Sequence, residues 1–124
     1  MSRPVVICID PYEEDLKLLE DYLRESLLEP LCFSTLWAGI NTIGMRPAEF
    51  VLVDYASGNH DAVLETVRLC HRHDISVCVM VHRSHIPTPE EVEEIGCMWL
   101  KDASFLETLP ELIAGGTGLL PKRR

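Results

Sequence analysis

The stretch Phe50-Val51-Leu52-Val53-Asp54 decides the fold of this chain. Four consecutive apolar residues followed by an aspartate indicate a strand buried on both faces, because a strand with one face in water alternates apolar and polar residues. Similar short apolar runs precede and follow this stretch, and the segments between them repeat their apolar residues at the helical period. This alternation predicts βαβ units around a parallel sheet, an α/β fold.

Five strands are expected between helices, which gives a five-stranded (βα)₅ sandwich of three layers. In chain order the predicted strands are Val5–Ile9, Leu31–Phe33, Phe50–Val53, Ile75–Val81 and Cys97–Leu100. Beyond Ala114, the run Gly115-Gly116-Thr117-Gly118 opens a stretch without periodicity. We therefore predict one domain over residues 1–114 and a flexible tail or linker over 115–124.

The helix after the first predicted strand has one apolar side. Its leucines are expected inside and its acids largely outside: Leu16, Leu19, Leu23 and Leu27 against Glu13, Glu14, Asp15, Glu20 and Asp21. Thr88-Pro89-Glu90-Glu91 predicts the start of the fourth helix through a capping box. The last helix covers roughly Phe105 to Ala114, where Pro110 implies a kink or a later start, with Thr108 and Glu111 as a second capping box.

Composition and charge narrow the class of protein. The chain of 124 residues is 47% hydrophobic and 25% charged, as in ordinary globular domains. Its apolar runs are far shorter than the roughly 20 residues that cross a bilayer, and too short for a secretory signal, so we expect a cytoplasmic protein without membrane contact. Five cysteines without a Cys-x-x-Cys pair indicate buried thiols in a reducing compartment. A net charge of −9 argues against direct nucleic-acid binding.

Polar residues follow four of the predicted strands: Asp10, Asp54, His82 and Lys101. The carboxyl ends of parallel strands meet at one edge of an open sheet, where ligands and chemistry gather. We therefore expect two carboxylates, an imidazole and an ammonium group to converge there.

These residues and their order resemble the response-regulator receiver family over residues 4–114. Val51-Leu52-Val53-Asp54 matches the strand that ends in the phosphate-accepting aspartate, Asp10 matches the first of two acids that hold Mg²⁺, and Leu100-Lys101 matches the lysine that contacts the phosphate. The resemblance implies a flavodoxin-like fold with strand order 2-1-3-4-5. It also implies a signalling switch, without metabolic activity, that a histidine kinase or phosphotransfer protein phosphorylates on Asp54.

The chemistry of these residue types supports the resemblance. A carboxylate attacks phosphorus poorly unless the charge on the phosphoryl oxygens is neutralised, so a hard cation and a fixed ammonium are its natural partners. Mg²⁺ keeps several waters and needs few protein ligands. Asp10, Asp54 and the backbone carbonyl of Ala56 are the expected metal ligands, and Lys101 is the expected phosphate contact.

The chain departs from the family at several positions. Pro11 replaces the second acid, which predicts weaker Mg²⁺ binding, and His82 replaces the threonine or serine of the switch position. Met98 stands in place of the switch aromatic, and Asp102 in place of a proline that is typically preceded by a cis peptide bond. These departures support the alternative of a pseudo-receiver, an interaction or dimerisation module that works without phosphorylation.

Structural roles compete with the functional ones. Asp10 would serve equally as a helix cap before Pro11, Asp54 could bond turn amides, and Lys101 could be a surface residue paired with Asp102. The histidines match no closed zinc site. A flavodoxin-like enzyme or ligand-binding domain is a remoter alternative. Receiver-like chains also often dimerise, here through 88–114, or lead into a C-terminal effector domain.

Overall fold

The structure, a computed structural model, describes residues 3–114, so the predicted tail at 115–124 lies outside the described residues. Within residues 3–114, five parallel strands form one sheet in the order β2-β1-β3-β4-β5. The strands are β1 Val5–Ile9, β2 Glu29–Phe33, β3 Phe50–Asp54, β4 Ser76–Val81 and β5 Met98–Leu100. The predicted fold class and strand order are confirmed.

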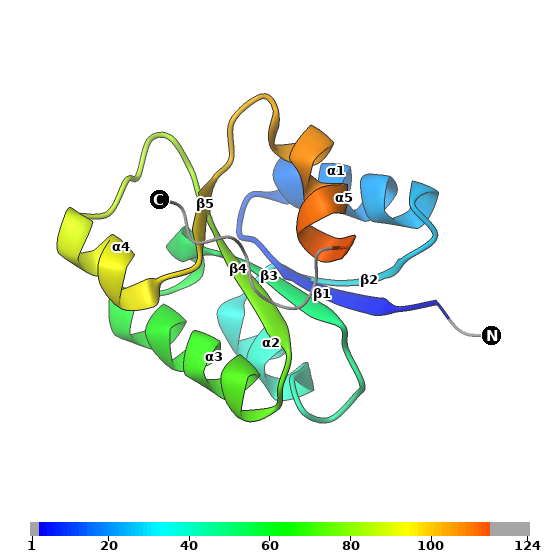
Figure 1. Ribbon diagram of the computed structural model, residues 1–124, viewed down its shortest axis with the longest axis horizontal. Coiled ribbons are helices and arrows are strands. Elements are labelled where there is room, and N and C mark those ends of the chain that lie inside the picture. Colours follow the sequence, from blue (N-terminus) through cyan, green and yellow to red (C-terminus); the bar gives the residue numbers. More distant parts are fainter. Residues whose placement is uncertain (1–2, 115–124) are drawn as a thin grey trace.

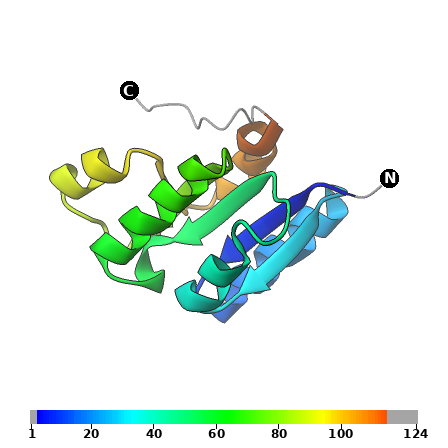
Figure 2. The ribbon, with the colours of Figure 1, turned by 90° about the horizontal axis from the view of Figure 1, so that it is seen from below.

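Helices cover both faces of the sheet and complete the three layers (Figure 1). On one face lie α1 Glu13–Glu25 and α5 Phe105–Ala114. On the other lie α2 Leu36–Thr42, α3 His60–Arg72 and α4 Pro89–Ile95, as Figure 2 also shows. A 3-10 turn, η1 Tyr55–Ser57, connects β3 to α3.

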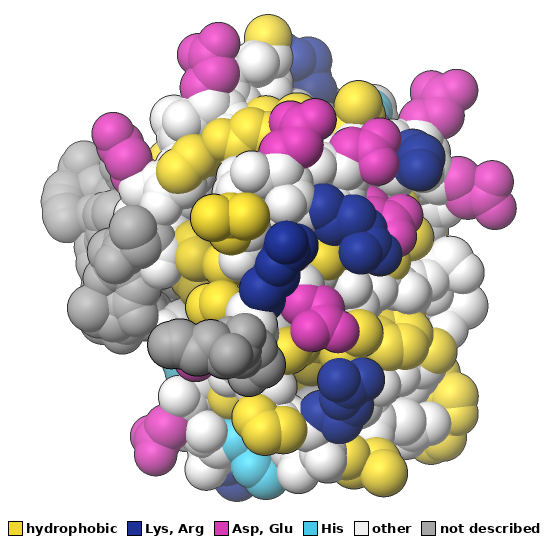
Figure 3. Space-filling view, turned by 90° about the vertical axis from the view of Figure 1, so that its right-hand side faces the viewer, with side chains coloured by type: hydrophobic (Ala, Val, Ile, Leu, Met, Phe, Trp, Pro, Cys, Tyr) yellow, Lys and Arg dark blue, Asp and Glu magenta, His cyan; other side chains and the backbone are white. Residues whose placement is uncertain are grey.

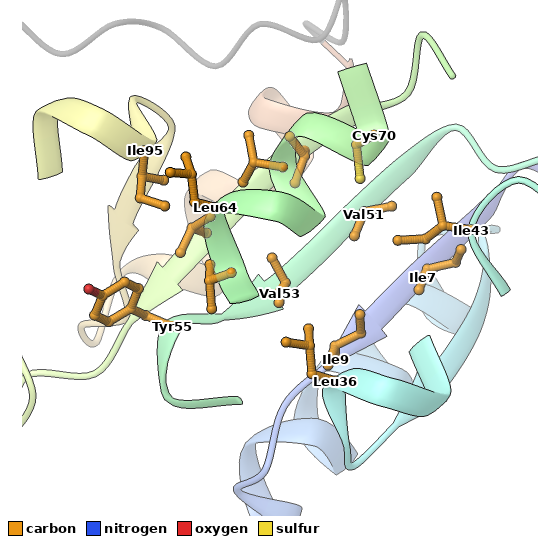
Figure 4. Close-up of a cluster of buried hydrophobic side chains, with 14 of the residues drawn as sticks. Ile7, Ile9, Leu36, Ile43, Val51, Val53, Tyr55, Leu64, Cys70 and Ile95 are labelled. Atoms are coloured by element: carbon orange, nitrogen blue, oxygen red, sulfur yellow. The ribbon is translucent and has the colours of Figure 1, made fainter. Parts of the chain in front are cut away.

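The central strands are buried on both sides, as their unbroken apolar runs predict. Ile7, Ile9, Val51 and Val53 point into the core under α2, α3 and α4, where Figure 4 shows them packed together. The alternate residues of the same two strands point into the second core, under α1 and α5: Val6, Cys8, Phe50 and Leu52. The sheet therefore separates two apolar cores and holds the strand ends rigidly at its edges.

The edge strands differ from their predicted bounds. β2 begins at Glu29, two residues before the predicted start at Leu31, and pairs with β1 along its whole length. Glu29-Pro30 does not read as a strand, but a proline that lacks an N–H is tolerated at a sheet edge. β5 is also shorter than predicted, because it begins at Met98 and not at Cys97.

The first helix ends earlier than its apolar period suggests. α1 stops at Glu25, and Leu27, predicted on its inner side, adopts a left-handed φ of 65° and is 66% exposed. The amide of Leu28 donates to the carbonyl of Leu23 at 3.0 Å and closes the helix end. The leucine spacing continues beyond the point where the backbone turns away.

The boundary signals of the last two helices give opposite outcomes. The predicted capping box is present at α4, where Thr88 and Glu91 cap each other's backbone amides. The second capping box is wrong, because α5 begins at Phe105 and carries Pro110 inside it. Thr108 instead donates its hydroxyl to the carbonyl of Phe105 at 2.9 Å, within the helix.

The amino ends of the strands lie opposite the candidate site. Arg3 and Arg46 line a shallow pocket there together with Glu29 and Glu49, and Figure 3 shows basic and acidic side chains intermingled on this side. Charges of both signs therefore share this face. No helix within residues 3–114 is long and apolar enough to span a membrane.

Candidate functional site

Asp10, Asp54 and Lys101 meet at the carboxyl edge of the sheet. Each lies at the end of a different strand: Asp10 follows β1, Asp54 closes β3 and Lys101 follows β5. The Lys101 Nζ lies 2.8 Å from Asp10 Oδ2 and 2.8 Å from Asp54 Oδ2. The sheet thereby brings Lys101 next to Asp10, which lies 91 positions earlier in the sequence.

A third carboxylate, Asp15, completes the cluster. Its Oδ2 lies 2.7 Å from the Lys101 Nζ, and its side chain is 34% exposed, whereas Asp10 and Asp54 are fully buried. The sequence places Asp15 among the largely outward acids of α1 and does not predict its contact with Lys101. A signal was present, because Asp15 lies four residues before Leu19 and therefore on the buried side of the helix.

The cluster has more carboxyl groups than cations. Burial raises the pKa of Asp10, although hydrogen bonds from Lys101 and from the Tyr12 amide oppose the rise. Burial alone would lower the pKa of Lys101, but its interactions with Asp10, Asp15 and Asp54 outweigh this and raise that pKa well above its ordinary value. The lysine therefore stays charged, and the cluster places three carboxyl groups around one ammonium.

The two oxygens of Asp54 have different environments. Oδ1 accepts a hydrogen bond of 2.8 Å from the Ala56 amide, the turn interaction expected of an aspartate after a strand. Oδ2 is buried, and among the described residues it has an ion pair with the Lys101 ammonium at 2.8 Å but no further hydrogen-bond partner. A buried carboxylate oxygen whose one partner is an ammonium, in a cluster with more carboxyl groups than cations, fits a site for a hard cation.

Mg²⁺ fits the donors that are present, with limits. Asp10 and Asp54 supply two buried carboxylates beside the 3-10 turn that carries Ala56. Within residues 3–114, no three side chains of His, Cys, Asp or Glu are arranged as a metal site. A magnesium ion that keeps several waters needs no third side chain. Its binding through Asp10, Asp54 and the Ala56 carbonyl stays a prediction.

The competing structural roles have mixed outcomes. Asp10 does not cap α1, which begins at Glu13; its Oδ1 instead accepts the Tyr12 amide at 2.9 Å in a local turn. Lys101 pairs with carboxylates other than Asp102. The Asp102 carboxylate instead accepts hydrogen bonds from the amide and hydroxyl of Ser104. The pairing of Lys101 with the buried acids is therefore specific. Within residues 3–114 no peptide bond is cis, including that between Lys101 and Asp102.

His82 lies beside the cluster without joining it. Its Nδ1 lies 2.7 Å from the Ser84 Oγ, and its ring packs against Tyr12 with centroids 5.0 Å apart. The Tyr12 ring in turn lies 5.1 Å from the Lys101 Nζ, a cation–π distance. The sequence did not predict a role for Tyr12. The Tyr12 ring therefore neighbours both the ammonium and the imidazole, and the residue is 36% exposed.

A second polar chain connects the turn after Asp54 to α4. The Tyr55 hydroxyl lies 2.8 Å from His60 Nδ1, and His60 Nε2 lies 2.7 Å from Glu94 Oε1. Tyr55 is buried, and burial raises the pKa of its phenol. Through His60, these contacts connect Tyr55, the residue next to Asp54, to α4. Glu94 lies 34 positions after His60 in the sequence.

A pocket of about 270 Å³ adjoins the cluster between α1 and α5. Lys101, Asp15 and His82 lie on its polar side, and Leu18 and Leu106 on its apolar side. This volume is below the roughly 300–1,000 Å³ of sites that enclose a small ligand. The pocket therefore gives little support to the alternative of a ligand-binding or metabolic domain.

Comparisons with known proteins agree on the fold. No family model matches the sequence. No curated protein matches it either. Among solved structures, a CheY-like receiver domain protein from Methanospirillum hungatei is similar, with a TM-score of 0.73 and 14% identity over 93% of this chain and 97% of that one. A response regulator from Thermotoga maritima gives a TM-score of 0.70 and 15% identity, over 90% and 98% of the two chains.

Chemotaxis protein CheY4 from Vibrio cholerae is similar to the same degree. Its TM-score is 0.73 at 11% identity, over 93% of this chain and 99% of that one. At such low identity the likeness rests on the path of the backbone and not on shared residues. The chain therefore has the fold of CheY-like response-regulator receiver domains.

Proposed function

We propose that this chain is a receiver domain that a histidine kinase or phosphotransfer protein phosphorylates on Asp54. The observation that carries the proposal is the position of Lys101, whose ammonium lies 2.8 Å from both Asp10 and Asp54. A fixed cation beside a carboxylate nucleophile is what phosphoryl transfer to an aspartate requires.

Each residue of the cluster has a task in this reaction. A carboxylate oxygen of Asp54 forms a bond to phosphorus while the bond from phosphorus to the donor's histidine nitrogen breaks. The Ala56 amide holds Oδ1, which leaves Oδ2 beside Lys101. Lys101 then pairs with the new phosphoryl oxygens, and Asp15 and Asp10 keep its ammonium in reach. Mg²⁺, when bound, would neutralise further charge on the phosphoryl group.

Labelling with a small phosphodonor tests the proposal. The protein is incubated with acetyl phosphate and millimolar Mg²⁺, and its intact mass is followed. We expect one added phosphoryl group in the wild type and in Asp61→Asn, an exposed aspartate at the start of α3 that serves as the matched control. Loss of the label in Asp54→Asn supports the proposal. A label that persists in Asp54→Asn contradicts it, as does the absence of a label from both the wild type and Tyr12→Ala.

One observation favours the pseudo-receiver as second candidate. Asp54 is fully buried, and the Tyr12 ring lies over the lysine that pairs with it. A phosphodonor cannot reach a carboxylate that stays covered. Tyr12→Ala separates the two candidates. If this variant is labelled and the wild type is not, Asp54 is a working acceptor that Tyr12 covers. If neither the wild type nor the variant is labelled, the phosphate-independent module is favoured.

Dimerisation through residues 88–114 and a C-terminal effector domain remain predictions. Sedimentation velocity on the wild type, Asp54→Asn and Asp54→Glu tests the first. A dimer that is unchanged by either variant favours the pseudo-receiver, and one that forms only after phosphorylation favours the switch.

A further inference from the structure

Cys8 and Cys32 lie opposite each other on adjacent strands. β1 and β2 are parallel, and their register pairs Cys8 with Cys32. Both side chains pack into the core under α1 and α5, so they project from the same face of the sheet. Adjacent strands lie about 4.7–4.9 Å apart. Disulfides usually join Cα atoms about 4.4–6.8 Å apart, so the strands need no large displacement to be joined here.

The two thiols differ in access to solvent. Cys8 is fully buried in the central strand β1, whereas Cys32 is only half-buried in the edge strand β2. A small oxidant that diffuses to this part of the surface therefore meets Cys32 first. Cys8 lies behind it, in position to react with whatever forms there.

The environment also favours the reactive form of Cys32. Its interaction with the Cys8 thiol lowers the pKa of Cys32 more than burial and the Glu20 carboxylate raise it, and the same interaction raises the pKa of Cys8. Burial instead raises the pKa of Cys70 to about 12 and that of Cys97 to about 11. Since the thiolate is the nucleophile, Cys70 and Cys97 are comparatively inert.

We propose that Cys32 and Cys8 are a redox-sensitive pair, which a peroxide converts into a reversible disulfide between β1 and β2. The half-buried thiol with a second thiol behind it is the arrangement of a sensor cysteine and its resolving partner. This proposal does not depend on phosphorylation of Asp54.

The reaction balances with hydrogen peroxide as oxidant. The Cys32 thiolate attacks one peroxide oxygen, an S–O bond forms, the O–O bond breaks, and the leaving hydroxide takes a proton to become water. The resulting sulfenic acid is then attacked by the sulfur of Cys8. An S–S bond forms, the S–O bond breaks, and a second water leaves with the Cys8 proton. Two thiols are oxidised and one peroxide is reduced to two waters.

The disulfide would join strands that end at the candidate site. Cys8 lies two residues before Asp10, and the Asp10 amide donates to the carbonyl of Phe33, which follows Cys32, at 3.0 Å. Oxidation therefore constrains the backbone that carries Asp10.

Peroxide titration of the folded chain tests the proposal. Reduced protein is treated with increasing hydrogen peroxide, remaining thiols are alkylated, and the unreduced digest is analysed by mass spectrometry. We expect a peptide pair cross-linked through Cys8 and Cys32 that dithiothreitol releases, while Cys70, Cys78 and Cys97 are recovered as thiols.

Three variants make the test specific. Cys32→Ser abolishes the cross-link, and Cys8→Ser leaves Cys32 as a sulfenic acid that dimedone traps. Cys97→Ser, the matched control, leaves the cross-link unchanged. Circular dichroism verifies that each variant is folded. The proposal is overturned if Cys97 oxidises as readily as Cys32, or if Cys32 reaches the sulfinic acid as fast in the wild type as in Cys8→Ser.

Discussion

Replacing Lys101 by methionine removes the cation from the candidate site while keeping most of the aliphatic side chain. The Lys101 side chain is only 9% exposed, and its ammonium lies 2.7–2.8 Å from three carboxylates. Two of these, Asp10 and Asp54, are fully buried. Removal of one partner from a buried ion pair costs about 3–5 kcal/mol, because the remaining charge has no compensation. We expect a loss of this size at neutral pH.

The loss depends on pH with a definite sign. Burial already raises the pKa of Asp10, and Lys101 opposes that rise. Without Lys101, the pKa of Asp10 in the folded protein therefore rises further. A carboxyl whose folded pKa exceeds its unfolded value of about 3.9 favours the folded state below that value and disfavours it above. The deficit of Lys101→Met is therefore small in acid and grows as the pH rises from about 3.9 through the folded pKa of Asp10.

Urea unfolding without divalent cations, followed by circular dichroism from acid to neutral pH, measures this deficit. Asp15→Asn is the matched control, because it removes the partner that is 34% exposed and should cost about 1 kcal/mol or less. Adding Asp54→Asn to Lys101→Met should recover part of the loss, because it removes one uncompensated charge. A deficit below about 1 kcal/mol at neutral pH, or one that does not change with pH, would refute the argument.

Three further predictions concern the rest of the fold. Gly39→Ala places a methyl group against the Ile9 side chain, within the first core, and should destabilise the protein by about 1–3 kcal/mol in urea unfolding; an unchanged midpoint would show that Ile9 moves freely. Thr88→Ala should cost about 0.5–2 kcal/mol through loss of the capping box, measured in the same way, and Thr88→Ser should restore most of it. A double-mutant cycle on His60 and Glu94 should give a coupling of about 1 kcal/mol or less, because Glu94 is 52% exposed; a much larger value would show that their contact is shielded from water.

The sequence predicts the central strands well because burial on both faces leaves no polar residues in them. The runs at Val5–Ile9 and Phe50–Asp54 are apolar to the last residue before the site, so their ends could be read directly. The edge strand β2 is harder, since one of its sides meets solvent and it tolerates Pro30. The period of α1 identifies its buried side, but the turn at Leu27 depends on the backbone and not on hydrophobicity.

The candidate site is predictable only where a residue lies at a strand end. Strand order alone places Asp10, Asp54 and Lys101 at one edge. Asp15 and Tyr12 belong to the segment after β1, and their contribution depends on the angle at which that segment leaves the sheet. His82 also lies at a strand end, yet its ring turns toward Tyr12 and Ser84. Position at a strand end is therefore not sufficient for a place in the cluster, as His82 shows, and not necessary, as Asp15 shows.

The position of Asp15 bears on what Pro11 removes. In the family that this chain resembles, two adjacent acids follow the first strand, and here the second is a proline. Asp15, one helical turn further on, returns a carboxylate to the cluster, but it approaches from the Lys101 side at 2.7 Å. The cluster thereby keeps as many carboxyl groups as the family has, but one of them lies in a different place. Asp15 contacts the Lys101 ammonium. A cluster arranged in this way favours control of Lys101 over tight binding of a metal ion, and the effect of Asp15→Asn on phosphate labelling should exceed its effect on Mg²⁺ affinity.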